Sequence, residues 1–528
     1  MALIYDDVIV GAGSSGSVLA SRLSEDPGRS VLLLEAGPDF ASVEETPQDL
    51  IDGRNMSVQA HDWGFMADAV PGRPITYPRG KVTGGSSAVN ATVALRGVPA
   101  DYDEWAAWGN DGWSWQDVLP YFRKLEDDED EHGDLHGTGG PIPIRRWKPG
   151  ELRPPQQAYF NVLRRLGFPE VTDHNHPDST GAGIIPQNQR NFVRMSAAIG
   201  YLAPARHRIN LTIKPNCLVD RVLFEGKRAI GVELECGGVR QQVFGRRITL
   251  SAGAVASPAI LLRSGIGPAA DLRALGIEPL VDAPVGTRLN DHPLAFVFGL
   301  PRPGVCDRSN PFIQVMLRYT APGSDVFNDM QLYFGSQFDV LELAGAEAMA
   351  MVGAQIVVGA GASLQRPLSR GRLTLASRDP HEQPKVDLNF CSDAQGEDMR
   401  RMVEGVRLGY QVVTSPELAP FVERVALLSD EAVASNEALS EYVRMTVGTT
   451  FHPVSTAPMG PESDANAVVD PRCRVRGVEN LRVVDASVMP NIVRCNTNLT
   501  CMMIGERVAD WMKAEQPQAV GGLAAAPA

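Results

Sequence analysis

A short glycine-rich run near the start of the sequence carries residue types that suit a phosphate ligand. The run reads GAGSSG at residues 11–16, and an acidic residue, Glu35, follows about 20 residues later. Gly11 permits a tight turn, Gly13 lets the backbone approach a pyrophosphate, and Gly16 lets a following helix pack closely. A carboxylate at position 35 suits a hydrogen bond from a ribose hydroxyl. Together these residues predict a dinucleotide-binding turn.

The elements that must hold this turn are visible in the hydrophobic pattern. An apolar run, residues 8–10, precedes the turn, and a helical pattern containing Val18 and Leu23 follows it. A second apolar run, residues 31–34, ends at Glu35. Strand, turn, helix and second strand form a Rossmann-like unit, in which the helix N-terminus offers unpaired N–H groups to phosphates. The pattern alone leaves open whether the dinucleotide is NAD or FAD.

Two other polar groupings invite a metal interpretation, and their surroundings argue against it. The acidic run 126–131, EDDEDE, is interpreted as a solvated connector, because nothing in the sequence fixes its geometry. His174 and His176 lie in a turn-like setting, and no further ligand pair follows at zinc spacing. We therefore expect loop histidines and predict no metal site.

Size, composition and charge restrict the class of protein. The chain has 528 residues, enough for two domains, with 44% hydrophobic and 21% charged residues, as in ordinary globular proteins. A net charge of −14 argues against nucleic acid or an anionic membrane as a partner. Seven scattered cysteines without C-x-x-C spacing, and a first strand that leaves no room for a leader, predict reduced thiols in a cytoplasmic protein. No apolar run approaches the length of a membrane span, and the oligomeric state stays open.

Patterns in the middle of the chain predict further elements. Apolar alternation from residue 211 to 235 predicts a hairpin that turns at Glu225-Gly226. Residues 257–268, SPAILLRSGIGP, predict a short helix that is entered through proline and ended by glycine.

The region from about residue 300 to 445 has a different character and is interpreted as a second domain. Three alternating runs resemble strands of an antiparallel sheet, at residues 331–334, 354–358 and 373–375. Residues 397–413 show a helical pattern.

With these segments in view, the sequence resembles the glucose–methanol–choline oxidoreductase family. Residues 80–90, GKVTGGSSAVN, closely match the first family signature and depart at Thr83, where an aliphatic residue is usual. Residues 253–267, GAVASPAILLRSGIG, match the second signature throughout. Residues 286–293 and 367–371 are also similar to family segments. The resemblance covers the chain up to its C-terminal tail.

The resemblance implies FAD rather than NAD, oxidation of alcohols, and two interleaved domains. The expected fold class is α/β (α+β overall), with a Rossmann-like FAD-binding domain and a substrate domain built on an antiparallel sheet with helices. We place the FAD-binding domain at residues 1–155, 210–300 and 446–516 and the substrate-binding domain at residues 156–209 and 301–445. Residues 517–528, rich in Ala, Gly and Pro, are predicted to be a disordered tail.

The residues expected to contact the flavin come from all parts of the FAD-binding domain. Some family members attach FAD covalently through a histidine that aligns with Val89, and because valine has no nucleophile we predict non-covalent FAD. The predicted cofactor residues are Gly11, Gly13, Ser14, Ser15, Gly16, Glu35, Ala36, Gly80, Val82, Gly85, Ser86, Asn90, Ala91, Val219, Ala252, Gly253, Asp485, Ala486, Asn496 and Thr497.

Alcohol oxidation by hydride transfer needs a base for the hydroxyl proton, and a neutral imidazole suits neutral pH. Among nine histidines, His452 lies in a segment, TTFHPVSTAPMG, that resembles the family's catalytic-histidine segment. Asn496 falls where the family places its second catalytic residue. Since an amide cannot act as a base, Asn496 is predicted to hold the substrate oxygen as negative charge develops there. From the residues alone, a core histidine at 452 and a helix-capping asparagine at 496 or 498 stay open.

Two neighbours of this pair concern the substrate pocket. Arg494 stands in a segment where relatives commonly have a second proline and small residues. Its side chain could bind an anionic substrate or could pair with a carboxylate, and both interpretations stay open. Phe451 could form a wall for an apolar or aromatic substrate or could belong to the core.

The sequence therefore predicts an FAD-dependent oxidoreductase that converts a primary alcohol, of aryl, furanic or choline-like type, to the aldehyde. Hydride passes to flavin N5 and the electrons then pass to O2 or another acceptor, so oxidase and dehydrogenase stay open. The alternative is a non-redox hydroxynitrile lyase of the same family, which keeps FAD and cleaves cyanohydrins. The lack of a leader and the asparagine at position 496 argue against that alternative.

Overall fold

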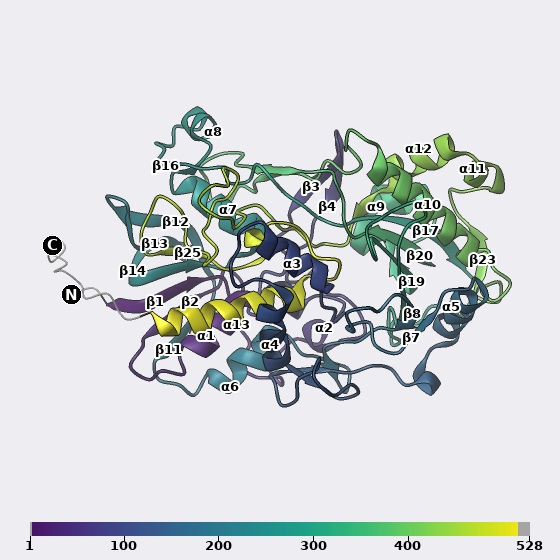
Figure 1. Cartoon of the computed structure of the whole chain (residues 1–528), viewed down its shortest axis with the longest axis horizontal. Helices are drawn as coiled ribbons and strands as arrows, with labels where there is room; N and C mark the ends of the chain where they lie inside the picture. Colours follow the sequence, from purple (N-terminus) through teal and green to yellow (C-terminus); the bar gives the residue numbers. More distant parts are fainter. Residues whose placement is uncertain (1–2, 516–528) are drawn as a thin grey trace.

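A computed structural model describes residues 3–515, in which two sheets lie side by side (Figure 1). The tail predicted at 517–528 lies outside the described residues. The first sheet has seven strands in the order β11-β2-β1-β14-β13-β12, with β25 also paired to β14. Its strands are β1 (Ile4–Val10), β2 (Val31–Leu34), β11 (Leu211–Lys214), β12 (Cys217–Glu225), β13 (Arg228–Cys236), β14 (Val239–Leu250) and β25 (Leu481–Val483).

The parallel part of this sheet confirms the predicted strand, glycine turn, helix and second strand. β1 pairs in parallel with β2 and β14, and β2 pairs in parallel with β11. After β1 the chain turns at Gly11, whose φ is 97°, and enters helix α1 (Ser14–Leu23). Helix α13 (Asn498–Ala514) packs on α1, where a Cβ added to Gly505 would lie 3.0 Å from both Ser15 O and Val18 Cβ. A side chain at position 505 would therefore push the two helices apart.

The predicted hairpin is confirmed as β12 and β13, which turn at residues 226–227. The two ends of this hairpin correct the prediction that all seven cysteines are reduced. Cys217 and Cys236 face each other in the antiparallel register, with Cα atoms 4.4 Å apart, and form a disulfide. The other five cysteines are free thiols. The register of the two strands places these cysteines opposite each other, although they are 19 positions apart in the sequence.

Helix α7 (Gly253–Arg263) confirms the predicted helix but begins four residues earlier, with Pro258 in its interior. Proline has no N–H group, so the carbonyl of Ala254, four residues before it, loses its helical partner. The hydroxyl of Thr456 donates a hydrogen bond of 2.8 Å to that carbonyl. A residue two hundred positions away thus allows the helix to include a proline.

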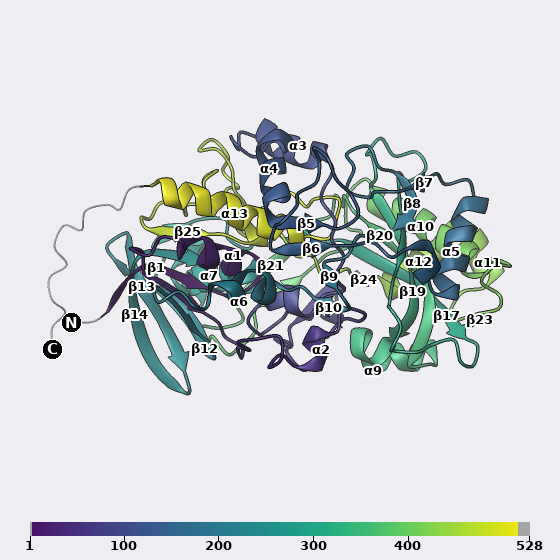
Figure 2. The ribbon, with the colours of Figure 1, turned by 90° about the horizontal axis from the view of Figure 1, so that it is seen from below.

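The second sheet has eight strands, in the order β23-β17-β20-β19-β18-β8-β7, with β24 also paired to β17. All pairs are antiparallel except β7–β8, and Figure 2 shows α5, α10 and α12 gathered around this sheet. Helix α10 has the limits predicted for it. The elements are β7 (Glu170–Val171), β8 (Gly181–Ile184), β17 (Pro293–Pro301), β18 (Val315–Tyr319), β19 (Met330–Asp339), β20 (Ile356–Leu364), β23 (Val422–Val425), β24 (Gly448–Thr449), α5 (Pro154–Arg165), α10 (Glu397–Val413) and α12 (Asn436–Thr446).

Alternation along β17 gives this sheet one face that packs on α10 and an opposite face. Val297 faces α10, where a Cβ on Gly409 would lie 3.2 Å from Val297 Cγ2. Phe296 and Phe298, on either side of it, point to the opposite face. Tyr333 on β19 lies on the same face as Phe296, because both residues pair with Gly361 on β20. The face of the sheet opposite α10 is therefore aromatic.

The predicted run at 373–375 lies outside the eight-stranded sheet. β21 (Arg372–Thr374) instead joins a four-stranded sheet with β22 (Lys385–Asp387), β3 (Met66–Val70) and β4 (Arg73–Thr76). The predicted domain boundaries stay a prediction. The remaining elements are α2 (Gln48–Ile51), α3 (Pro99–Ala107), α4 (Trp115–Leu125), α6 (Ala203–Ala205), α8 (Ala269–Ala274), α9 (Val340–Val352), α11 (Asp430–Ala434), β5 (Glu126–Asp128), β6 (Ile142–Ile144), β9 (Gln189–Arg190), β10 (Val193–Arg194), β15 (Ile266–Gly267) and β16 (Val281–Asp282).

The acidic run at 126–131 is not the solvated connector that the sequence suggested, because its first part forms β5 and is buried. Glu126 is fully buried and binds the guanidinium of Arg96. Asp128 binds Arg146 at 2.8 Å and lies 3.2 Å from His136 Nδ1. Partners distant in the sequence thus supply the cations that let this run enter the core.

The expected loop histidines lie on the loop between β7 and β8, with His174 buried and His176 exposed. Within residues 3–515, no helix has the length and apolar character of a membrane span.

Candidate active site

A cavity of about 750 Å³ brings together the glycine turn of the first sheet and the aromatic face of the second. Most of the predicted cofactor residues line it. These are Gly11, Gly13, Ser14, Ser15, Glu35, Ala36, Gly80, Gly85, Ser86, Asn90, Ala91, Val219, Ala252, Gly253, Asp485, Ala486, Asn496 and Thr497.

The glycine turn and the segment at 80–90 meet backbone to backbone beside this cavity. A Cβ added to Gly85, whose φ is 53°, would lie 2.7 Å from Gly13 Cα. The N–H of Gly84 donates to the carbonyl of Ala12 at 2.7 Å. The two segments therefore form a narrow backbone cradle that any side chain at position 85 would fill.

The cradle has the donors that a dinucleotide needs. Gly13 is the N-cap of α1, and because glycine has no side chain, no side-chain hydrogen bond caps the helix. The amides of the first helical turn are therefore available to a ligand in the cavity. Asn498 Nδ2 also lines the cavity and is buried without a hydrogen-bond partner in the described part of the chain. The residues present thus fit an FAD pyrophosphate.

Glu35 closes the end of β2 as the sequence predicts. Its Oε2 accepts from the N–H of Ala12 and its Oε1 from the N–H of Gly37, both at 2.9 Å. Burial raises the pKa of Glu35 to about 7, although these backbone N–H groups favour the ionised form. The carboxylate therefore holds the glycine turn in shape while it lines the cavity.

Two predicted cofactor residues do not reach the cavity. A Cβ on Gly16 would lie 1.9 Å from the carbonyl oxygen of Gly11, so Gly16 serves the packing of α1 against the turn. Val82 is fully buried in a small apolar cluster with Leu50 and Val89. Its side chain therefore packs in this cluster and does not line the cavity.

His452 and Asn496 meet in the cavity. Asn496 Nδ2 lies 3.2 Å from His452 Nε2, and both residues line the cavity wall. Burial lowers the pKa of His452 well below its ordinary value, and the neighbouring His292 and Arg79 lower it further. The imidazole is therefore neutral and can accept a proton. The catalytic roles of this pair stay predictions.

Helix α13 does not use Asn496 as its cap. Its N-cap is Thr497, which makes no side-chain cap hydrogen bond, and Asn498 is the first helical residue. Asn498 Oδ1 accepts from Ser14 Oγ at 2.7 Å and so ties α13 to the start of α1. The amide of Asn496 is thus directed to His452.

Asp291, which sequence reasoning missed, fixes the backbone around the histidine. Its Oδ1 accepts from the N–H groups of His452 and His292, at 2.8 and 2.7 Å. Its Oδ2 accepts from the hydroxyls of Tyr77 and Thr449, at 2.6 and 2.7 Å. One buried carboxylate thereby joins three separate segments. The family-like segment at 286–293 contains Asp291 and His292 and was the available signal.

Phe451 lines the cavity beside His452, as predicted for a pocket wall. Its φ of 66° lies in the left-handed region, which is uncommon for an aromatic residue. The hydroxyl of Thr449 accepts from its N–H at 2.7 Å and holds this conformation. The guanidinium of Arg79 lies 5.9 Å from the centre of the Phe451 ring.

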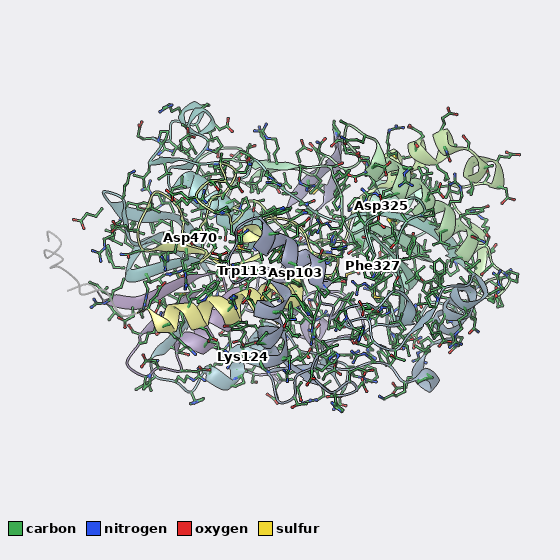
Figure 3. The ribbon with its side chains drawn as sticks, in the orientation of Figure 1. Asp103, Trp113, Lys124, Asp325, Phe327 and Asp470 are labelled. Atoms are coloured by element: carbon green, nitrogen blue, oxygen red, sulfur yellow. A yellow bond between two sulfur atoms is a disulfide. The ribbon has the colours of Figure 1, made fainter. Side chains whose placement is uncertain are left out.

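Arg494 is not among the residues that line the cavity, so the structure does not bring it to the predicted substrate pocket. Its Nε lies 2.7 Å from Asp101 Oδ1, and its backbone N–H donates to Asp101 Oδ2 at 2.9 Å. Its NH1 group donates to the carbonyl of Phe327, in the surface loop marked by Asp325 and Phe327 in Figure 3. The structure thus supports the ion-pair interpretation of Arg494.

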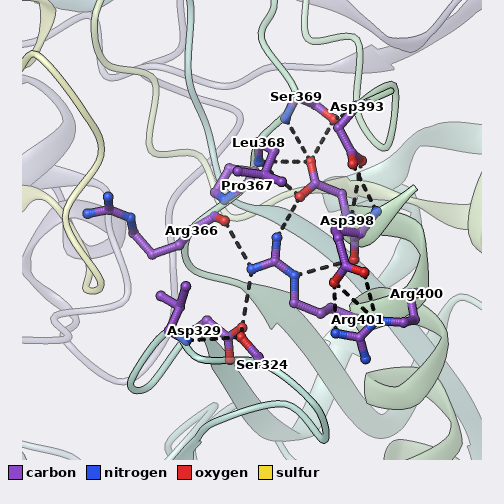
Figure 4. A network of polar contacts seen from close by, with 12 residues as sticks. Ser324, Asp329, Arg366, Pro367, Leu368, Ser369, Asp393, Asp398, Arg400 and Arg401 are labelled. Atoms are coloured by element: carbon purple, nitrogen blue, oxygen red, sulfur yellow. Dashed lines mark hydrogen bonds and ion pairs between the residues drawn. The ribbon is translucent and has the colours of Figure 1, made fainter. Parts of the chain in front are cut away.

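The ion pair continues into a larger network. Arg366 NH1 also contacts Asp101, at 3.0 Å, and its carbonyl accepts from Arg401 on α10 (Figure 4). Arg401 in turn pairs with Asp398 and Asp329. Fixed charges therefore connect the loop preceding Asn496 to helix α10 on the second sheet.

The side of the cavity formed by the second sheet is mostly phenyl rings. Phe296 and Phe338 stack with ring centres 4.7 Å apart, and Phe298 lies 5.1 Å from Phe296. Phe312 and Tyr333 complete this lining. Such a surface suits a flat apolar or aromatic group.

Comparisons with known proteins agree with the sequence resemblance. The family described as GMC oxidoreductase matches with its N-terminal part at residues 5–294 and its C-terminal part at residues 367–505. The 5-(hydroxymethyl)furfural oxidase of Methylovorus sp. (strain MP688) is 38% identical over 536 residues, which cover 96% of this chain and 98% of that protein. The oxygen-dependent choline dehydrogenase of Pseudomonas aeruginosa (strain LESB58) is 36% identical over 548 residues, covering 97% and 95%. The crystal structure of pyridoxine 4-oxidase from Mesorbium loti superposes with a TM-score of 0.86 at 30% identity, covering 97% of this chain and all of that one.

Proposed function

Because the chain belongs to the GMC oxidoreductase family, a family of FAD-dependent enzymes that act on CH–OH donors, we propose that it oxidises a primary alcohol to the aldehyde. The observation that carries the proposal is the contact between His452 Nε2 and Asn496 Nδ2 in the wall of the cavity. An alcohol oxygen placed in the cavity beside both atoms would have a base and a hydrogen-bond donor within reach.

In this proposal His452 removes the hydroxyl proton and Asn496 holds the oxygen. The neutral imidazole accepts the proton at Nε2, and the amide N–H of Asn496 donates to the oxygen as its negative charge grows. The bound FAD supplies the acceptor for the hydride that leaves the carbinol carbon.

The attachment of FAD is proposed to be non-covalent. Val89 lines the cavity at the position where some family members carry the histidine that bonds the flavin, and an isopropyl group offers no nucleophile. The cradle between Gly13 and Gly85, the amides of α1 and the carboxylate of Glu35 would then hold the cofactor through hydrogen bonds.

Among the possible alcohols, an aryl or furanic alcohol fits better than a choline-like one. Phe451 and the phenyl rings on β17 and β19 offer apolar faces to a flat ring. Arg79 also lines the cavity and lowers the pKa of His452, which places a cation near the base. A cation at this position repels a quaternary ammonium group, because like charges interact unfavourably in a buried site.

The test is anaerobic mixing of the purified holoenzyme with benzyl alcohol, 5-(hydroxymethyl)furfural, choline and mandelonitrile, followed by the visible absorbance of the flavin. Bleaching by the two ring alcohols and little by choline is expected. Recovery of the colour in air would identify O2 as an acceptor, and recovery only with an added dye would identify a dehydrogenase. Release of aldehyde from mandelonitrile without any bleaching by alcohols would instead support the lyase alternative.

The cytoplasmic location stays part of this proposal. The Cys217–Cys236 disulfide is of a kind that is rare in the cytosol. Alkylation of thiols in intact cells, followed by denaturation without a reductant, tests the location, because a cytoplasmic protein should yield seven free thiols and a protein with the disulfide formed should yield five.

A further inference from the structure

We propose that His292 is a positioning residue that keeps the proton of His452 on Nδ1 and so leaves Nε2 free to act as the base. The inference rests on the proposed function, because it concerns how the base of that reaction is prepared. It is carried by one contact, since His292 Nδ1 lies 3.0 Å from His452 Nδ1 in a fully buried setting.

The proton positions follow from the neighbours of the His452 ring. The Asn496 amide nitrogen can only donate a hydrogen bond, and it lies 3.2 Å from Nε2, so Nε2 must be the acceptor. A neutral imidazole has a single N–H group, which is then on Nδ1. That N–H faces His292 Nδ1, and because two N–H groups cannot face each other, His292 accepts and holds its own proton on Nε2.

Thr450 makes the second contact to the same nitrogen without changing this assignment. Its Oγ1 lies 2.9 Å from His452 Nδ1 and 3.4 Å from the carbonyl oxygen of His292. The hydroxyl can therefore donate to the carbonyl and accept from Nδ1–H. Both neighbours of Nδ1 then favour the same tautomer of His452.

Geometry and burial keep His292 in the role of acceptor. Its ring stands nearly perpendicular to that of His452, with an angle of 81° between the planes. Its backbone N–H, like that of His452, donates to Asp291, so one carboxylate sets the distance between the two rings. Burial lowers the pKa of His292 to about 3, which keeps the ring neutral.

The same contact stabilises the product of proton transfer. When the O–H bond of the alcohol breaks, its electron pair stays on oxygen and the proton forms a new bond to His452 Nε2. His452 then carries a positive charge with N–H groups on both nitrogens. The bond from Nδ1–H to neutral His292 becomes charge-assisted and is strengthened at that moment. His292 therefore offers an acceptor to the Nδ1–H group of His452 without contacting the substrate.

A matched pair of variants tests this role in the holoenzyme. His292→Asn places an amide oxygen at the position of Nδ1, whereas His292→Leu has the same size and branching but no acceptor. We expect the leucine variant to lower the limiting rate of flavin reduction about tenfold, less than the about 10²–10⁴-fold that the general base itself contributes, with little change in KM. The asparagine variant should recover most of the rate.

A spectroscopic readout keeps the inference testable if a variant does not fold. In wild-type holoenzyme labelled with ¹⁵N-histidine, the signals lost in His452→Gln should show a protonated Nδ1 and an unprotonated Nε2. A protonated Nε2 in the resting enzyme would overturn the inference. So would equal rates for the asparagine and leucine variants, or a Thr450→Val variant that alone reproduces the expected loss.

Failure of the proposed function gives a different result. If His452→Ala reduces the flavin at the wild-type rate, His452 is not the base and the proposed function fails. If His452→Ala is impaired while both His292 variants behave like wild type, only the inference about His292 fails.

Discussion

His452 and Asn496, 44 positions apart in the sequence, place Nε2 and Nδ2 at 3.2 Å in the wall of one cavity. The two side chains reach this point from different elements, a loop after β24 and the turn before α13.

The first prediction concerns the histidine. His452→Ala should slow flavin reduction by an alcohol about 10²–10⁴-fold, because the base is lost. Stopped-flow absorbance under anaerobic conditions measures this rate, and an unchanged flavin content shows that the cavity is intact.

Asn496 should affect the reaction through charge on the substrate oxygen. Asn496→Asp replaces an N–H donor by a carboxylate of the same shape, which repels the oxygen as negative charge develops. We expect the limiting rate of reduction to fall about 10²–10³-fold, as for loss of one donor at a developing oxyanion. Asn496→Ser, which can still donate, serves as the matched control. Similar rates for the aspartate variant and wild type would show that Asn496 does not contact the oxygen.

Non-covalent FAD should leave the polypeptide when the fold is lost. Val89 offers no nucleophile to the flavin, so acid precipitation of the pure protein should leave the yellow colour in the supernatant. Absorbance spectra of the supernatant and of the redissolved pellet measure the division. Colour that stays with the pellet would mean that another residue forms a covalent bond.

The Arg494–Asp101 ion pair should matter for stability rather than for substrate charge. Both side chains are buried, and because Arg366 still pairs with Asp101, the loss of Arg494 should cost less than the about 3–5 kcal/mol of a fully uncompensated buried charge. Arg494→Ala should therefore lower the unfolding temperature and change KM by the same factor for benzyl alcohol and for 4-carboxybenzyl alcohol. Asp101→Asn should have a similar effect on stability. A KM that rises only for the acid would restore the substrate-binding interpretation.

The buried charges around β5 should make stability depend on pH. Burial disfavours the His136 cation, but Asp128, Asp173 and Glu126 outweigh it and raise the pKa of His136 from 6.5 to about 10. A group whose pKa is raised by folding contributes stability that is complete below pH 6.5 and is lost as pH rises through 10. The unfolding temperature should fall between pH 7 and 10, and His136→Gln should lose most of this slope. A parallel slope in the variant would mean that other groups are responsible.

The same cluster should respond in the opposite sense in acid. Burial raises the pKa of Asp128, but His136 and Arg146 outweigh it and lower the value to about 2. Its contribution is complete above the ordinary value of 3.8 and is lost as pH falls through 2.

Local patterns allowed much of the fold to be predicted. The glycine turn, the hairpin β12–β13 and the limits of α10 follow from turn residues and from hydrophobic periods of a few positions. Partners far apart in the sequence caused the errors. The Ala254 carbonyl is satisfied by Thr456, Glu126 is matched by Arg96, and Cys217 meets Cys236 only through strand register. Local patterns of residue type do not indicate which residues form such pairs.

The candidate site divides in the same way. The resemblance to a family located His452 and Asn496, but their surroundings come from tertiary contacts. Asp291 is recognisable only when its four donors are seen together, and Arg494 is assigned only when Asp101 is seen beside it. Conversely, Gly16 and Val82 belong to motifs whose other residues line the cavity. These two residues themselves pack against neighbouring parts of the protein.

The short strand β24 has a consequence for engineering. Gly448 and Thr449 pair with Leu294 and Pro293 at the start of β17, only three residues before His452. The pairing of β24 with β17 therefore fixes the position of the proposed base relative to the sheet that forms the alcohol pocket. The sequence neighbours of this base nevertheless belong to the C-terminal segment. A chimera that takes residues 293–445, which include β17, from a relative while keeping the native loop at 448–452 would join a pocket and a base that did not evolve together. Recombination libraries should transfer β17 and that loop as one block.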